Sequence, residues 1–294
     1  MSPNEHKSGY VALVGRPNAG KSTLMNALLG DKISIITPKP QTTRHQIVGI
    51  HSTADSQIIF LDTPGIIEPR YKLQEAMMDF VEKARKDADL VLFLVESTER
   101  EIPDYVFEVF EELKQPVLLV VNKMDLSSEK QVEPMVNKLN GRYKFVDVVY
   151  ISALQGTGIE ELKQKMIELL PAGPPFYPKD IISKHPVRFF VAELIREQIF
   201  MQFQEEIPYS CTVDIVDYNE GPDLDRINAE IIVNRKSQKG MLIGKKGSAI
   251  KKLGTESRKA IEAFVGKQVY LDLHVKVREK WREKEGMLKH LGYK

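Results

Sequence analysis

The chain has 294 residues, of which 42% are hydrophobic and 28% charged, and its formal net charge is +1 at pH 7. These proportions exclude disordered and collagen-like classes, and the length predicts two domains. A single cysteine excludes an internal disulfide and favours a reducing compartment. The longest apolar run, Leu90–Val95, is far shorter than the roughly 20 residues that span a bilayer. The first ten residues lack the pattern of a signal peptide. We therefore expect a cytoplasmic protein without a transmembrane segment.

Charge is distributed unevenly along the chain. Residues 1–180 contain 21 basic and 25 acidic residues, whereas the remainder contains 21 basic and 16 acidic residues. Between Arg235 and Lys259, nine basic residues accompany Glu256 as the one acidic residue. Such a segment indicates a polyanionic partner, or else a solvated charged helix face.

Short apolar runs alternate with amphipathic stretches between Tyr10 and Leu170. The pattern predicts a doubly wound α/β domain with a mainly parallel sheet. We expect strands at Tyr10–Val14, Gln57–Leu61, Leu90–Val95, Pro116–Val121 and Asp147–Ile151, and helices at Ser22–Gly30, Lys72–Lys86, Pro103–Lys114, Glu129–Asn140 and Gly158–Leu170.

A linker and a second domain follow. Residues 171–186 contain five prolines, which indicates a linker of restricted flexibility. Beyond it, three segments alternate polar and apolar residues, as half-buried strands do. A smaller α+β domain is expected, with helices at Pro186–Phe203, Gly247–Phe264 and Glu279–Leu291 and strands at Ser210–Val216, Arg226–Val233 and Val269–Val277.

GRPNAGKS has the spacing of a P-loop and lies between a predicted strand and a predicted helix. Its glycines let backbone N–H groups face phosphate oxygens, the lysine supplies a cation and the serine can ligate Mg²⁺. The predicted phosphate-binding residues are Gly15, Arg16, Pro17, Asn18, Ala19, Gly20, Lys21 and Ser22.

Two further motifs follow the carboxyl ends of predicted strands, where open α/β sheets bind ligands. In DTPG, Asp62 is expected to support Mg²⁺ and Gly65 to meet the γ-phosphate. In NKMD, Asp125 can accept both guanine N–H groups, which adenine cannot offer. The predicted nucleotide-binding residues here are Asp62, Thr63, Pro64, Gly65, Ile66, Asn122, Lys123, Met124 and Asp125, with Ser152, Ala153 and Leu154 of the later SAL segment backing the base.

These motifs, together with QTTRH at Gln41–His45, resemble the five ordered motifs of translation-factor-class GTPases. The resemblance implies that one threonine of QTTRH reaches Mg²⁺, and we favour Thr43 over Thr42. It implies Ser22, Thr43 and Asp62 around the metal, and Lys21, Thr43 and Gly65 in hydrolysis. Ile66 stands where many GTPases place a water-orienting glutamine, so slow intrinsic turnover is expected. Asn18 resembles the asparagine of GTPases that use K⁺, although it can equally cap the loop.

GKKG at Gly244–Gly247 lies between an apolar helical segment and a predicted helix, as the backbone-clamping loop of a KH module does. The order of elements around it resembles a prokaryotic, type II KH domain. The predicted RNA-binding residues are Ile243, Gly244, Lys245, Lys246, Gly247, Lys251 and Lys252.

A GTPase domain followed by a KH domain resembles the Era family of ribosome-assembly GTPases over nearly the whole chain. The expected domains are residues 1–170, a proline-rich linker at 171–186, and a KH domain at 187–294 with a basic C-terminal helix. The resemblance implies hydrolysis of GTP to GDP, and binding near the 3′ end of 16S rRNA during maturation of the 30S subunit. It also implies peripheral association with the inner face of the cell membrane; we expect a monomer.

The sequence argues against three alternative functions. A GTPase of tRNA modification would carry a fused dimerisation domain or a catalytic cysteine motif. A pure RNA-binding module would keep the nucleotide pocket as a structural feature. A membrane-linked signalling GTPase would carry a lipidation motif, and Ser2 stands where myristoylation needs glycine.

Overall fold

The computed structural model describes residues 6–111 and 113–293. They form two compact units that divide between Lys184 and His185, except that the short segment Tyr71–Leu73 groups with the second unit. The first unit holds a six-stranded sheet in its described residues, with strand order β2-β3-β1-β4-β5-β6. Its strands are β1 (Lys7–Gly15), β2 (Ile47–Ser52), β3 (Ser56–Asp62), β4 (Leu90–Glu96), β5 (Val117–Asn122) and β6 (Val148–Tyr150). All neighbours pair in parallel except β2 and β3.

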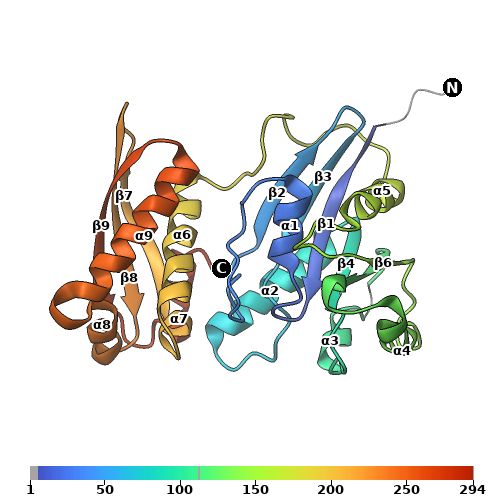
Figure 1. Ribbon diagram of the computed structural model, residues 1–294, viewed down its shortest axis with the longest axis horizontal. Helices are drawn as coiled ribbons and strands as arrows, with labels where there is room; N and C mark the ends of the chain where they lie inside the picture. Colours follow the sequence, from blue (N-terminus) through green and yellow to red (C-terminus); the bar gives the residue numbers. More distant parts are fainter. Residues whose placement is uncertain (1–5, 112, 294) are drawn as a thin grey trace. The chain divides into compact units, whose positions relative to one another are not determined.

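Helices cover both faces of this sheet, so strand residues on both sides are buried. Ala12 and Val14 of β1 belong to a core cluster with residues of α2 and α4, while the alternate residues Val11 and Leu13 are equally buried. On the other face α1 and α5 contact each other (Figure 1). The helices are α1 (Lys21–Leu29), α2 (Lys72–Asp87), α3 (Tyr105–Glu108), α4 (Glu129–Asn140) and α5 (Ile159–Leu169), with a 3-10 turn η1 (Met124–Leu126).

The position of β1 sets where a ligand can bind. β1 pairs with β3 on one side and β4 on the other, which makes its carboxyl end the switch point of the sheet. The P-loop, DTPG and NKMD follow β1, β3 and β5 at this edge. The predicted doubly wound α/β class is confirmed.

Two local predictions for the first unit differ from the structure. The sequence does not predict the antiparallel edge strand β2, because a glycine interrupts its short apolar run. The predicted helix Pro103–Lys114 is reduced to α3, since Phe107 and Phe110 turn inward onto Phe93; residue 112 lies outside the described residues.

The proline-rich segment, residues 171–184, packs against β2 and β3 of the first unit. The Gln57 side chain, fully buried in β3, accepts hydrogen bonds from the N–H groups of Phe176 and Tyr177 at 2.7 and 2.9 Å. The Ile50 N–H of β2 donates to the Ile182 carbonyl at 2.8 Å. Side-chain and sheet-edge contacts therefore fix this segment along β2 and β3.

The second unit has a three-stranded mixed sheet in its described residues, ordered β7-β8-β9, with β7 antiparallel and β9 parallel to β8. Figure 1 shows α6 and α9 side by side on one face of this sheet. The order of elements is that of a type II KH fold, as predicted. The elements are α6 (Val187–Gln202), α7 (Ile207–Ser210), β7 (Cys211–Asn219), β8 (Leu224–Val233), α8 (Lys236–Ile243), η2 (Lys245–Gly247), α9 (Ser248–Val265), β9 (Gln268–Val277), η3 (Trp281–Glu283) and α10 (Glu285–His290).

The predicted single C-terminal helix at Glu279–Leu291 is wrong. Lys280 takes a left-handed conformation with φ of 55°, and Lys284 is extended, so the segment divides into η3 and α10. The break lets Trp281 become fully buried, where its indole N–H donates to the Ser210 carbonyl at 3.0 Å. Burial of this large side chain outweighs the helical propensity of the charged residues around it.

Candidate functional site

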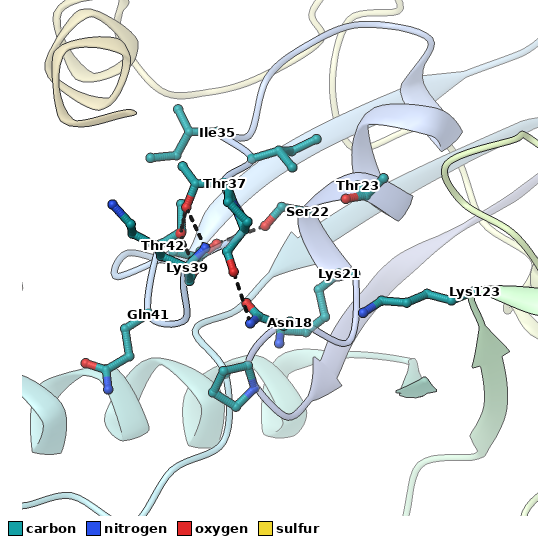
Figure 2. Close-up of a pocket in the computed structure, with 16 residues that line it drawn as sticks. Asn18, Lys21, Ser22, Thr23, Ile35, Thr37, Lys39, Gln41, Thr42 and Lys123 are labelled. Carbon is teal, nitrogen blue, oxygen red and sulfur yellow. Dashed lines mark hydrogen bonds between the residues drawn. The ribbon is translucent and has the colours of Figure 1, made fainter. Parts of the chain in front are cut away.

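A cavity of about 350 Å³ opens at the carboxyl ends of β1, β3 and β5. Figure 2 shows Asn18, Lys21 and Lys123 on one side of it, and Thr37 and Thr42 of the loop after α1 on another. The predicted residues that line it are Pro17, Asn18, Gly20, Lys21, Ser22, Thr43, Gly65 and Lys123. Residues from four motifs that are separated in sequence thus line one continuous cavity.

The P-loop conformation depends on glycine at position 20. Gly20 has φ of 94°, and a Cβ there would lie 2.2 Å from the Asn122 amide nitrogen. That amide donates to the Ala19 carbonyl at 2.9 Å and accepts from the Ala153 N–H at 3.0 Å. Asn122 therefore ties the P-loop to the SAL segment, which explains its burial at the end of β5.

Lys21 is buried beneath the loop, where its ammonium donates to the carbonyls of Gly15 and Arg16 at 2.9 and 3.0 Å. Burial lowers the pKa of Lys21 to about 8, against the opposing effect of Asp62. A buried cation held by carbonyl groups is well placed to receive a phosphate anion, which would pair with the ammonium directly.

Three oxygen-bearing side chains converge beside Lys21. Ser22 Oγ lies 2.8 Å from Thr43 Oγ1 and donates to Asp62 Oδ2 at 2.7 Å. Asp62 is fully buried, its pKa is raised by desolvation, and its Oδ1 has no hydrogen-bond partner among the described residues. Hydroxyl and carboxylate oxygens are the ligands that Mg²⁺ takes, so this donor set fits that ion.

Thr42 faces a different partner from Thr43. Its hydroxyl lies 2.6 Å from that of Thr37 and donates to the Lys39 carbonyl at 2.8 Å. Of the two threonines in QTTRH, Thr43 is therefore the one beside Ser22.

The remaining DTPG residues shape the turn rather than the cavity wall. Thr63 Oγ1 donates to the Leu13 carbonyl at 2.6 Å, and both Thr63 and Pro64 are buried. The Ile66 side chain packs in the core, and its N–H donates to the Gly15 carbonyl at 3.0 Å. Ile66 thus offers the cavity no side chain that could orient water.

The guanine motif lies next to the cavity. Asp125 Oδ1 accepts from Ser152 Oγ at 2.6 Å, and the Met124 N–H donates to the Ile151 carbonyl at 3.0 Å. These bonds bring NKMD and SAL together, although neither Asp125 nor the SAL segment lines the cavity itself. Leu154 is 80% exposed.

Several contacts of the site were missed from sequence. Ser34 donates to Asp62 Oδ2 at 3.0 Å, and Glu96 and Glu99 form ion pairs with Lys123 and Arg16. Glu96 ends β4, and Ser34 and Glu99 lie in loops; none of the three belongs to a spaced motif, so no sequence signal marks them.

The GKKG loop of the second unit has the conformation its glycines predict. Gly244 has φ of 71°, and a Cβ there would lie 2.7 Å from the Ala249 Cβ. Lys245, Lys246, Lys251 and Lys252 are exposed around the loop, while Ile243 is partly buried against the core. Exposed lysines around a loop whose backbone a strand can approach closely are typical of a surface that binds a nucleic-acid strand.

Comparisons with known proteins agree with this architecture. A family described as 50S ribosome-binding GTPase matches residues 10–123, and a KH domain family matches residues 206–282. The chain is 48% identical to the chloroplastic GTPase ERA-like protein of Arabidopsis thaliana, over 99% of this chain and 70% of that protein. It is 46% identical to GTPase Era of Thermoanaerobacter sp. strain X514, over 98% and 97% of the two chains.

Two solved structures are similar over the full length. Both align with a TM-score of 0.94 at 39% identity, covering 98% of this chain and 99% of theirs. One is a variant of Aquifex aeolicus Era bound to GDP and AlF4⁻. The other is Era in complex with MgGDPNP and nucleotides 1506–1542 of 16S ribosomal RNA.

Proposed function

This chain belongs to the Era family of GTPases, and we propose from that premise that it binds 16S rRNA near the 3′ end and assists maturation of the 30S subunit. It is a GTPase. The observation that carries the proposal is the full-length similarity to an Era structure that holds a 16S rRNA fragment. The exposed cations around the GKKG loop support the same partner.

On the nucleotide side, we propose that P-loop N–H groups and Lys21 hold the phosphates. Asp125, oriented by Ser152, accepts the guanine N–H groups, and Lys123 lies at the cavity wall. We propose that the Gly65 N–H meets the γ-phosphate. The closeness of Gly65 to the P-loop supports this role, because a Cβ at Gly65 would lie 2.6 Å from the Pro17 nitrogen. Hydrolysis then depends mainly on positioning and on charge stabilisation.

Mg²⁺ fits the site through Ser22, Thr43 and Asp62. When bound, the ion would neutralise charge on the phosphates. The orphaned Asp62 Oδ1 supports this assignment, because a buried carboxylate oxygen without a partner is costly.

On the RNA side, we propose that Gly244–Gly247 clamp the backbone of a single strand, with Lys245, Lys246, Lys251 and Lys252 facing its phosphates. None of the helices in the described residues combines the length and apolarity needed to cross a bilayer. We also propose a cytoplasmic location and a monomeric state. Family membership supports a peripheral association with the membrane.

Crosslinking in cells followed by sequencing of the bound RNA tests the proposed function. Reads should concentrate near the 3′ end of small-subunit rRNA, and depletion of the protein should accumulate immature 30S particles. A Gly247→Asp variant should lose the crosslinks. Enrichment of tRNA instead would support a role in tRNA modification, and would contradict the ribosomal role.

A further inference from the structure

Lys123 in the NKMD motif adopts a left-handed backbone conformation, with φ of 63° and ψ of 38°. This region is unfavourable for L-residues because Cβ crowds the carbonyl oxygen. The turn at Lys123 joins two fixed groups, the buried Asn122 amide and the Asp125 carboxylate that accepts from Ser152. The direction of Asp125 therefore depends on this strained residue.

Ser97, the first residue after β4, contacts the strained peptide from the neighbouring strand. Its Oγ donates to the Lys123 carbonyl at 2.7 Å, and its N–H donates to the Asn122 carbonyl at 2.8 Å. Ser97 is 8% exposed, so water has little access to replace a lost bond. The parallel register places Glu96 opposite Asn122, which brings Ser97 level with Lys123.

We propose that Ser97 is a positioning residue for guanine recognition. By holding the Lys123 carbonyl, it keeps the residue in its left-handed conformation and keeps the Asp125 carboxylate aimed at the base. Ser97 acts through Lys123 and not on the base itself. The inference rests on the proposed guanine site at Asn122–Asp125.

Ser97→Ala tests the inference through nucleotide selectivity. Inosine triphosphate offers the N1–H but lacks the 2-amino group, so a well-aimed Asp125 favours GTP. Ser97→Ala should raise the Kd for GTP about tenfold, or about 1.4 kcal/mol, and should lower the GTP-to-ITP preference while kcat stays within about twofold. Ser56→Ala is the matched control, because it removes another buried hydroxyl at the turn between β2 and β3. It should change neither Kd nor preference.

A double-mutant cycle with Lys123→Gly isolates the mechanism. Glycine adopts positive φ without a steric penalty. In that background, Ser97→Ala should therefore cost less than roughly threefold in GTP affinity. Equal losses in both backgrounds, or an unchanged GTP-to-ITP preference in Ser97→Ala, would overturn the inference.

Asp125→Asn distinguishes a failure of the guanine site from a failure of the role of Ser97. If it leaves GTP affinity unchanged, the guanine site itself is wrong. If it removes the preference for GTP while Ser97→Ala leaves that preference intact, the site stands and the role of Ser97 fails.

Discussion

The hydroxyl oxygens of Ser22 and Thr43 lie 2.8 Å apart, although 21 positions separate the two residues in the chain. Thr42, the adjacent residue, bonds instead to Thr37 and to the Lys39 carbonyl. Thr43→Ala should therefore reduce Mg²⁺-dependent GTP turnover about tenfold or more, whereas Thr42→Ala should have a smaller effect. Turnover measured across a Mg²⁺ titration compares the two variants. A larger loss in Thr42→Ala would reverse the assignment.

Asp125→Asn should weaken GDP binding by roughly 100-fold or more and admit xanthosine nucleotides, because the amide then donates where xanthine accepts. Equilibrium binding of GDP and XDP measures both effects. Asp79→Asn, at an exposed position of α2, serves as the control and should bind GDP normally. Normal GDP affinity in Asp125→Asn would remove this residue from the guanine site.

Gly247→Asp should abolish RNA binding and leave basal GTP hydrolysis intact. A Cβ at Gly247 meets no atom within 4 Å, so no clash opposes the side chain. The φ of 78° makes any L-residue there locally strained, and the added carboxylate repels phosphate. Gly266→Asp, after the last residue of α9, is the matched control, because Gly266 has φ of 74° and equally open space. Binding of a 16S 3′-end RNA by fluorescence anisotropy is the measurement, and retained affinity would argue against the KH surface.

Neutralising Lys245 and Lys246 should reduce the salt dependence of RNA binding. Each lost phosphate contact changes the slope of log K against log salt by about 0.7 on single strands. The double Lys→Gln variant should therefore shift the slope by about 1.4 if both lysines contact phosphate. An unchanged slope would place the two ammonium groups away from the RNA backbone.

Ile66 offers no side chain that could orient water, so hydrolysis needs another source of transition-state stabilisation. Asn18→Ala tests whether a monovalent cation beside Asn18 supplies it. Asn18 lines the cavity with φ of 66°, and its amide donates to the Pro38 carbonyl at 3.4 Å. If a monovalent cation binds beside the phosphates, turnover in K⁺ should exceed turnover in Na⁺ by about tenfold. Asn18→Ala should remove that difference. Equal rates in the two salts at equal ionic strength would assign Asn18 to loop capping alone.

Contiguous motifs were predictable from sequence because their chemistry is local. GRPNAGKS follows a buried strand and precedes a helix, so its glycines, lysine and serine must surround one point. The same holds for GKKG, where a positive φ at Gly244 and Gly247 requires glycine. The alternation of apolar runs was enough to predict the α/β class, since a strand covered on both faces has no polar side.

Contacts between distant segments were decided by the tertiary structure. The choice of Thr43 over Thr42 depends on how the loop after α1 returns to the sheet, and one residue of shift would exchange them. Ser97 and Ser34 serve the site only because parallel pairing and loop closure bring them to it. Trp281 interrupts a segment with helical propensity, because the free energy of burying an indole exceeds that of a few helical hydrogen bonds. Packing of this kind is non-local, and no window of sequence contains both partners.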